Sequence, residues 1–153
     1  MSEDFSALAA EFWKQCDKGL EPALATVDGE GVASRAVAVV PVDGKLCFST
    51  MADSNKMKQI ALNPRVALCL EAIQVRGTAR AAGALDSPEG KPTRDALVAA
   101  FGERVEPFIN DPGMIVVEIT PTWGGFGRLD ANEMFEPDFV GRRAHQVRSL
   151  IPI

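Results

Sequence analysis

The 153-residue chain contains no tyrosine, a single histidine and only three cysteines. The cysteines, Cys16, Cys47 and Cys69, form neither a CxxC pair nor any spacing typical of metal ligands. We expect them to be small buried hydrophobic residues in a reducing compartment. The lone His145 cannot assemble a metal cluster by itself. The sequence therefore predicts no metal site and gives no support to metal-dependent hydrolysis.

Long apolar runs and an excess of positive charge are also missing. No segment approaches the ~20 apolar residues of a membrane span, and the acidic N-terminus lacks the basic start of a signal peptide. The net charge of −5 argues against a general nucleic-acid binder, which needs a basic face. With 46% hydrophobic residues, the composition is that of an ordinary soluble protein. We expect one cytoplasmic domain over residues 1–153, long enough to bury a real core.

The residue patterns predict a mainly β chain with helices between the strands. An amphipathic helix occupies residues 1–19 and stops at Gly19. Further helices are expected after Ser54, ending at Asn63-Pro64, and from a Thr93 cap to about residue 101. Alternation and turn signals, including Asp43-Gly44, predict strands at 23–28, 32–42, 45–50, 65–71, 74–83 and 114–120.

Six strands with two hairpin turns indicate a small, mostly antiparallel barrel. The strand at 65–71 is apolar on both faces, so we expect both to be covered, one of them by helices or by a second subunit. Residues 122–153 are predicted to be a C-terminal loop and tail, with 123–128 a loop and 141–153 a short helix or tail.

Residues 49–56 are predicted to form an anion-binding corner. Ser49 and Thr50 end a strand, Ser54 is placed to cap the next helix, and Lys56 lies in its first turn. Open amide groups and a lysine at a helix start favour an anion. Arg35 lies on an otherwise apolar strand face and needs a partner, because an unpaired buried charge is costly. That partner is either an internal carboxylate or the phosphate of a ligand.

These motifs, in this order, resemble the pyridoxamine 5′-phosphate oxidase-like flavoproteins. That family consists of FMN-binding split β-barrels, which are usually homodimers. The resemblance covers about the first half of the chain, and the segments that carry it are 25–29, Arg35, 43–50, 53–56, 63–68 and 74–77.

The resemblance implies that Arg35 and Lys56 hold the FMN phosphate and that the strand after Arg35 runs beside the isoalloxazine ring. Gln74 would reach the polar edge of the flavin. Trp123 would either stack on or shield the flavin across a dimer interface, or close the barrel as a core tryptophan. The residues predicted to bind the cofactor are Arg35, Ala36, Val37, Ser49, Thr50, Ser54, Asn55, Lys56, Gln74 and Trp123.

The chain also departs from the family pattern. Asn55 stands where members often carry an arginine, and Val40 stands where true pyridoxamine phosphate oxidases place a substrate lysine. The tyrosine that contacts the substrate phosphate in those enzymes is missing. Their C-terminal substrate motif, an arginine and a histidine, is matched only loosely by Arg142-Arg143-Ala-His145. The fold and the cofactor therefore carry over, whereas oxidation of vitamin B6 compounds does not.

The predicted function is that of an FMN-dependent oxidoreductase, homodimeric, acting on a small substrate with an electron donor such as a nicotinamide. Because a flavin carries the redox chemistry itself, no catalytic acid, base or nucleophile is demanded of the protein. Two alternatives stay open. In the first, the same barrel serves as a module that binds flavin or another phosphorylated ligand without turnover; in the second, it holds a deazaflavin or haem.

Overall fold

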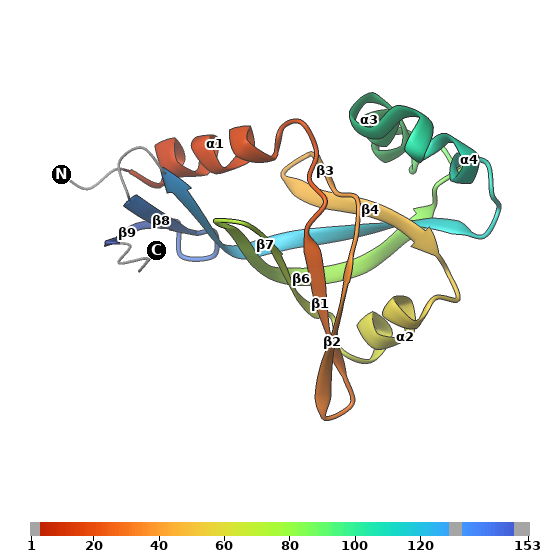
Figure 1. The fold of residues 1–153 in the computed structure, drawn as a ribbon, viewed down its shortest axis with the longest axis horizontal. Coiled ribbons are helices and arrows are strands. Elements are labelled where there is room, and N and C mark those ends of the chain that lie inside the picture. The colour runs from red at the N-terminus through yellow and green to blue at the C-terminus, as the bar shows by residue number, and fades with distance from the viewer. Residues whose placement is uncertain (1–3, 129–132, 149–153) are drawn as a thin grey trace.

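A computed structural model describes residues 4–128 and 133–148. The described chain forms one mainly antiparallel sheet of nine strands, rolled into a barrel with helices around it (Figure 1). The strand order is β2-β1-β5-β6-β7-β4-β3, and β8 and β9 extend the sheet from β7. The strands are β1 (Ala23–Asp28), β2 (Gly31–Ala36), β3 (Val40–Val42), β4 (Lys45–Met51), β5 (Arg65–Leu70), β6 (Ile73–Ala84), β7 (Met114–Arg128), β8 (Glu133–Asp138) and β9 (Arg143–Arg148).

The helices lie at the edges of this barrel. They are α1 (Phe5–Cys16), α2 (Asn55–Leu62), α3 (Lys91–Phe101) and the single turn α4 (Glu106–Ile109), with a 3₁₀ turn at Gly102–Arg104 between the last two. Helix α1 packs near β8, α2 contacts β1, and α3 covers β3 and β4 (Figure 1). None of the described helices is both long and apolar enough to cross a membrane.

Most strand positions agree with the sequence-based expectation, but the predicted strand 32–42 is two strands. Its backbone pairs with β1 up to Ala36 and then changes partner. Val39 exchanges hydrogen bonds of 2.8 and 2.9 Å with Leu20, on the segment that precedes β1. This exchange joins the segment before β1 to the segment before β3, which is the strand at the far end of the sheet. The Asp43-Gly44 turn between β3 and β4 is confirmed, with positive φ angles of 50° and 72° that suit a tight hairpin.

Two apolar clusters fill the molecule. The main cluster lies inside the barrel, where α1 contributes Leu8 and Phe12 and α2 contributes Met57 and Ile60. Phe126 of β7 is fully buried there and stacks on Phe135 of β8 at 5.6 Å between ring centroids. The second cluster lies between the sheet and α3 and consists of Val40, Cys47, Leu85, Leu97, Met114 and Val116. Because Met57 and Ile60 are buried in the main cluster, they hold α2, and with it the first turn of the helix, against the barrel.

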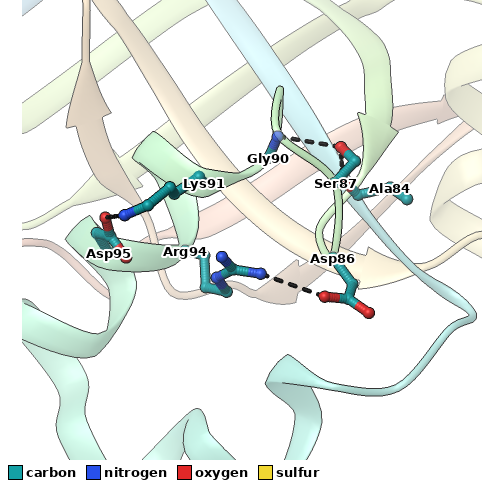
Figure 2. Close-up of polar contacts among 7 residues, drawn as sticks. All are labelled: Ala84, Asp86, Ser87, Gly90, Lys91, Arg94 and Asp95. Atoms are coloured by element: carbon teal, nitrogen blue, oxygen red, sulfur yellow. Dashed lines mark hydrogen bonds and ion pairs between the residues drawn. The ribbon is translucent and has the colours of Figure 1, made fainter.

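The start of α3 differs from the prediction. Thr93 is buried inside the helix, and the cap position belongs to Gly90. A side chain at Gly90 would place its Cβ 2.4 Å from the carbonyl oxygen of Ala84, so the close backbone approach requires glycine. The Ser87 hydroxyl donates to that same carbonyl at 2.6 Å and accepts from the Gly90 amide at 3.2 Å (Figure 2). Figure 2 also shows the flanking ion pairs Lys91–Asp95 and Arg94–Asp86.

The C-terminal part of the chain is more ordered than predicted. Residues 123–128 continue β7 rather than forming a loop, because they pair with β6 on one side and β8 on the other. Gly124 allows this path, since a Cβ there would lie 3.1 Å from ring atoms of both Phe12 and Phe139. The predicted short helix or tail after Gly141 contains β9, which pairs with β8, and residues 149–153 lie outside the described residues.

The prediction that β5 is buried on both faces is wrong for the single chain. Val66 and Leu68 point into the barrel and are buried, whereas Ala67 is half-buried and Cys69 is exposed on the opposite face. The helices pack elsewhere, so this face of β5 stays open. Cys69 is therefore not the buried residue that was expected, unlike Cys16 and Cys47.

Candidate functional site

The residues of the predicted anion corner lie where β4 ends and α2 begins. Thr50 is the last inward-facing residue of β4 and is 5% exposed. Its hydroxyl accepts a hydrogen bond from Lys56 Nζ at 2.8 Å and donates to Ser54 Oγ at 3.3 Å. Ser54 occupies the cap position of α2, but its side chain accepts no hydrogen bond from the helix, contrary to its expected capping role. The structure therefore gathers two hydroxyls and a lysine at one helix start.

Arg35 lies next to this group, held between β1 and α2. Its Nη1 donates to Thr26 Oγ1 at 2.8 Å and to the Leu24 carbonyl at 3.3 Å, and its Nη2 donates to Gln59 Oε1 at 2.8 Å. The Thr26 hydroxyl in turn donates to Gln59 Oε1 at 2.6 Å. The internal carboxylate considered from the sequence is thus absent among the described partners of Arg35, which are an alcohol, an amide and a carbonyl.

Thr26 and Gln59 were missed by the sequence-based reasoning, although the sequence holds a signal for each. Gln59 follows Lys56 by three residues, so both project from one side of α2. Thr26 alternates with Leu24 on β1 and therefore shares its inward face. Thr26 is only 1% exposed, which makes its hydrogen bonds to Arg35 and Gln59 obligatory.

The two charged side chains described in the corner, Arg35 and Lys56, are both positive. Across the described chain, the hydrogen-bond acceptors of Arg35 and Lys56 are all uncharged. Burial, followed by the repulsion of the nearby Arg35 guanidinium, holds the pKa of Lys56 below its ordinary value. Two cations therefore share a partly buried place, and no carboxylate of residues 4–128 or 133–148 pairs with either of them. An anionic group of a ligand fits this donor set, because it would accept from both cations and relieve their repulsion.

The other predicted residues are placed less closely. Ser49 precedes Thr50 on β4, so its side chain projects to the opposite face of the sheet and only its backbone borders the corner. Asn55 is exposed at the first position of α2. On the strand side, Ala36 is exposed and Val37 is buried in the main cluster. The structure does not bring the Ser49 hydroxyl together with those of Thr50 and Ser54.

A second feature, the outer groove, lies on the open face of β1, β5 and β6. It has a volume of about 520 Å³, is largely apolar, and is lined by residues that include Ala25, Ala67 and Arg76. Thr26 also borders the outer groove, but its hydroxyl faces inward to Arg35, so the groove and the Arg35 network lie on opposite faces of β1. Among the residues that the structure describes, no three His, Cys, Asp or Glu side chains gather closely enough to hold a metal ion.

Gln74 and Trp123 lie on this same side of β6 and β7. Gln74 is exposed and pairs with Gly125 across the strands, two positions from the pair formed by Arg76 and Trp123. The Arg76 guanidinium carbon lies 4.6 Å from the centroid of the Trp123 ring, a cation–π contact. Trp123 is half-buried, so it is not the core tryptophan that was one of the two expectations.

Comparisons with known proteins bear on the family and on the fold. The sequence model of the family described as pyridoxamine 5′-phosphate oxidase matches residues 11–126, well over half of the chain. None of the curated proteins matches the sequence at a significant level.

Solved structures share the fold. General stress protein 26 from Bacillus anthracis strain Sterne is 18% identical, with 93% of this chain and 98% of that chain covered at a TM-score of 0.60. HutZ, the haem storage protein from Vibrio cholerae, is 16% identical, with coverages of 78% and 91% and a TM-score of 0.58. A protein described as F420 reductase is 23% identical, with coverages of 67% and 86% and a TM-score of 0.54. At these identities the likeness establishes the fold alone, and it confirms the predicted split barrel.

Proposed function

Because the chain belongs to the pyridoxamine 5′-phosphate oxidase-like family, we propose that it binds FMN and acts as an FMN-dependent oxidoreductase on a small substrate. The observation that carries this proposal is the pairing of Arg35 and Lys56 in one corner with only uncharged acceptors. A phosphate monoester supplies the missing negative charge. In this proposal Lys56, Arg35 and the hydroxyls of Thr50 and Ser54 hold that phosphate.

The protein's share of the chemistry is then binding and orientation. A bound flavin supplies the redox chemistry by accepting and passing on electrons. The outer groove, on the face of β1 opposite to the Thr26 hydroxyl, offers an apolar surface for a flat ring. The exposed amide of Gln74 on the same face is suited to hydrogen-bond the polar edge of such a ring. We assign no catalytic acid or base among these residues.

Oxidation of pyridoxamine phosphate is not part of this proposal. Val40, which stands in place of the family's substrate lysine, is 1% exposed and packs in the second apolar cluster under α3. It therefore offers no charge to a substrate phosphate.

A deazaflavin and a haem are the alternative cofactors, since proteins described as an F420 reductase and a haem storage protein share the fold. The corner fits a phosphate of either flavin type. For haem, the only histidine of the chain, His145, is exposed on β9, whereas Lys56 lies at the start of α2 with Arg35 of β2 near it. We therefore favour a phosphorylated flavin.

We also propose that a second copy of the chain covers the outer groove. The open face of β5 presents Ala67 and Cys69 and is continuous with this apolar groove. Sedimentation of the purified protein should give a dimer, and Ala67→Arg should shift it toward monomer because the new charge would be buried at the contact. Ala61→Arg, on the exposed surface of α2, is the matched control. A wild-type protein that sediments as a monomer would contradict this assembly.

Turnover is tested separately from binding. The FMN-loaded protein is mixed anaerobically with NADH or NADPH, and the flavin absorbance is followed before an electron acceptor is added. Bleaching by the nicotinamide and recovery with the acceptor are expected of an oxidoreductase. A flavin that is reduced by dithionite but stays oxidised with both nicotinamides would instead favour the module that binds flavin without turnover.

A further inference from the structure

Gln59 accepts hydrogen bonds both from Arg35 and from Thr26, which itself contacts Arg35. Its Oε1 accepts one hydrogen bond from Arg35 Nη2 at 2.8 Å and another from Thr26 Oγ1 at 2.6 Å. The same threonine hydroxyl accepts from Arg35 Nη1 at 2.8 Å, so the three side chains form a closed triangle. Because Thr26 lies on a strand and Gln59 on α2, the triangle fixes the guanidinium relative to both elements.

The triangle occupies one side of the guanidinium and leaves another side available. Arginine has five N–H donors. Two on Nη1 and one on Nη2 are used by Thr26, the Leu24 carbonyl and Gln59. Within the described chain, the Nε–H and the second Nη2–H have no acceptor. Such a pair of parallel donors is the kind that binds a carboxylate or phosphate through two oxygens.

The chemical identity of the acceptor matters as much as its position. A glutamate at position 59 would have nearly the same shape and would pair with Arg35 as an ion pair. Glutamine holds the guanidinium in the same direction but leaves its charge uncompensated. Lys56, one helical turn earlier on the same side of α2, adds a second uncompensated charge. The local sequence thus keeps the net charge of the corner positive.

Resting on the proposed function, we propose that Gln59, together with Thr26, is a positioning residue that presents the free donors of Arg35 to a phosphate monoester. The uncharged amide at position 59 makes the corner discriminate between FMN and riboflavin, the same flavin without its phosphate. This arrangement selects a doubly charged phosphate, because Arg35 and Lys56 each keep N–H donors that the protein does not use.

The test compares wild type with Gln59→Glu, and uses Lys58→Glu as a control. Lys58 is exposed on the same helix, so its substitution also adds negative charge to α2 without entering the triangle. FMN and riboflavin affinities are measured by fluorescence titration, and the melting temperature of the ligand-free protein by calorimetry. We expect Gln59→Glu to weaken FMN binding about tenfold or more, to leave riboflavin binding unchanged, and to raise the melting temperature. Lys58→Glu should change the FMN-to-riboflavin ratio only slightly.

A merely structural glutamine would not shift this ratio. If Gln59→Glu retains the wild-type ratio of the two affinities, the positioning role is refuted. Should that variant fail to fold, Gln59→Met removes the acceptor without adding charge, and a ratio unchanged from wild type refutes the role equally. Wild-type protein that binds FMN no more tightly than riboflavin refutes the proposed function itself, so the two failures are distinguishable.

Discussion

Replacing Lys56 by glutamine removes one of the two charges assigned to the cofactor phosphate and shortens the side chain by only one atom. The Lys56 ammonium is half-buried and lies 2.8 Å from the Thr50 hydroxyl. Two unit charges 4 Å apart near a protein surface attract by about 4 kcal/mol, part of which is lost to desolvation. A hydrogen bond to a charged group contributes a net of about 1.5–3 kcal/mol. At 1.4 kcal/mol per factor of ten, FMN binding should weaken by about 10- to 100-fold.

The assay is a fluorescence titration of the ligand-free protein with FMN and, in parallel, with riboflavin. Lys58→Gln is the matched control, since it removes the same charge from the exposed side of α2. Lys56→Gln should affect FMN and spare riboflavin, and the control should affect neither strongly. Equal FMN affinities for wild type, Lys56→Gln and Lys58→Gln would refute the assignment of the phosphate to this corner.

The same substitution should change the pH dependence of stability. The pKa of Lys56 in the folded state is lowered by burial and then by Arg35, so the unfolded chain binds its proton more tightly. Stability therefore rises as the pH increases through the folded-state pKa of Lys56 toward its ordinary value. Denaturation of the ligand-free protein across the alkaline range should show this rise in wild type and lack it in Lys56→Gln.

Further predictions concern the core, the sheet and the thiols. Phe126→Ala should lower the free energy of unfolding by about 3–5 kcal/mol in chemical denaturation, because the ring is fully buried; a loss below 1 kcal/mol would contradict that burial. Gly77→Ala should cost about 1–3 kcal/mol, since its Cβ would lie 2.5 Å from the Thr120 carbonyl oxygen, whereas Gly31→Ala, with its nearest neighbour at 3.7 Å, should be tolerated. In a thiol-labelling assay at mildly alkaline pH of Ala67→Arg, in which no second copy should cover this face of β5, exposed Cys69 should react fast and the other two cysteines slowly, because burial raises the pKa of their thiols to about 12 and about 11; Cys69→Ser in the same variant should abolish the fast phase.

The features predicted correctly are those with local causes. The Asp43-Gly44 turn requires positive φ at both residues, and the end of α2 follows from Asn63-Pro64. Both signals lie within a few residues of the structure they determine. The gathering of Thr50, Ser54 and Lys56 was predicted for the same reason, since all three lie within seven consecutive residues.

The features that were missed depend on distant partners. The Gly-rich end of β7 has weak strand propensity, and only its pairing with β6 and β8 makes it a strand. Arg35 finds its acceptor Gln59 on α2, a distance of 24 residues along the chain. Sequence patterns indicated that the arginine needs a partner, but the packing of α2 against β1 decides that the partner is neutral.

The visible absorption spectrum of the purified protein, combined with mass spectrometry of the molecule released by heat, tests the proposed cofactor most directly. Flavin absorbance and the mass of FMN are the predicted results. A colourless protein that also fails to take up added FMN would contradict the proposal that Arg35 and Lys56 form an FMN phosphate site.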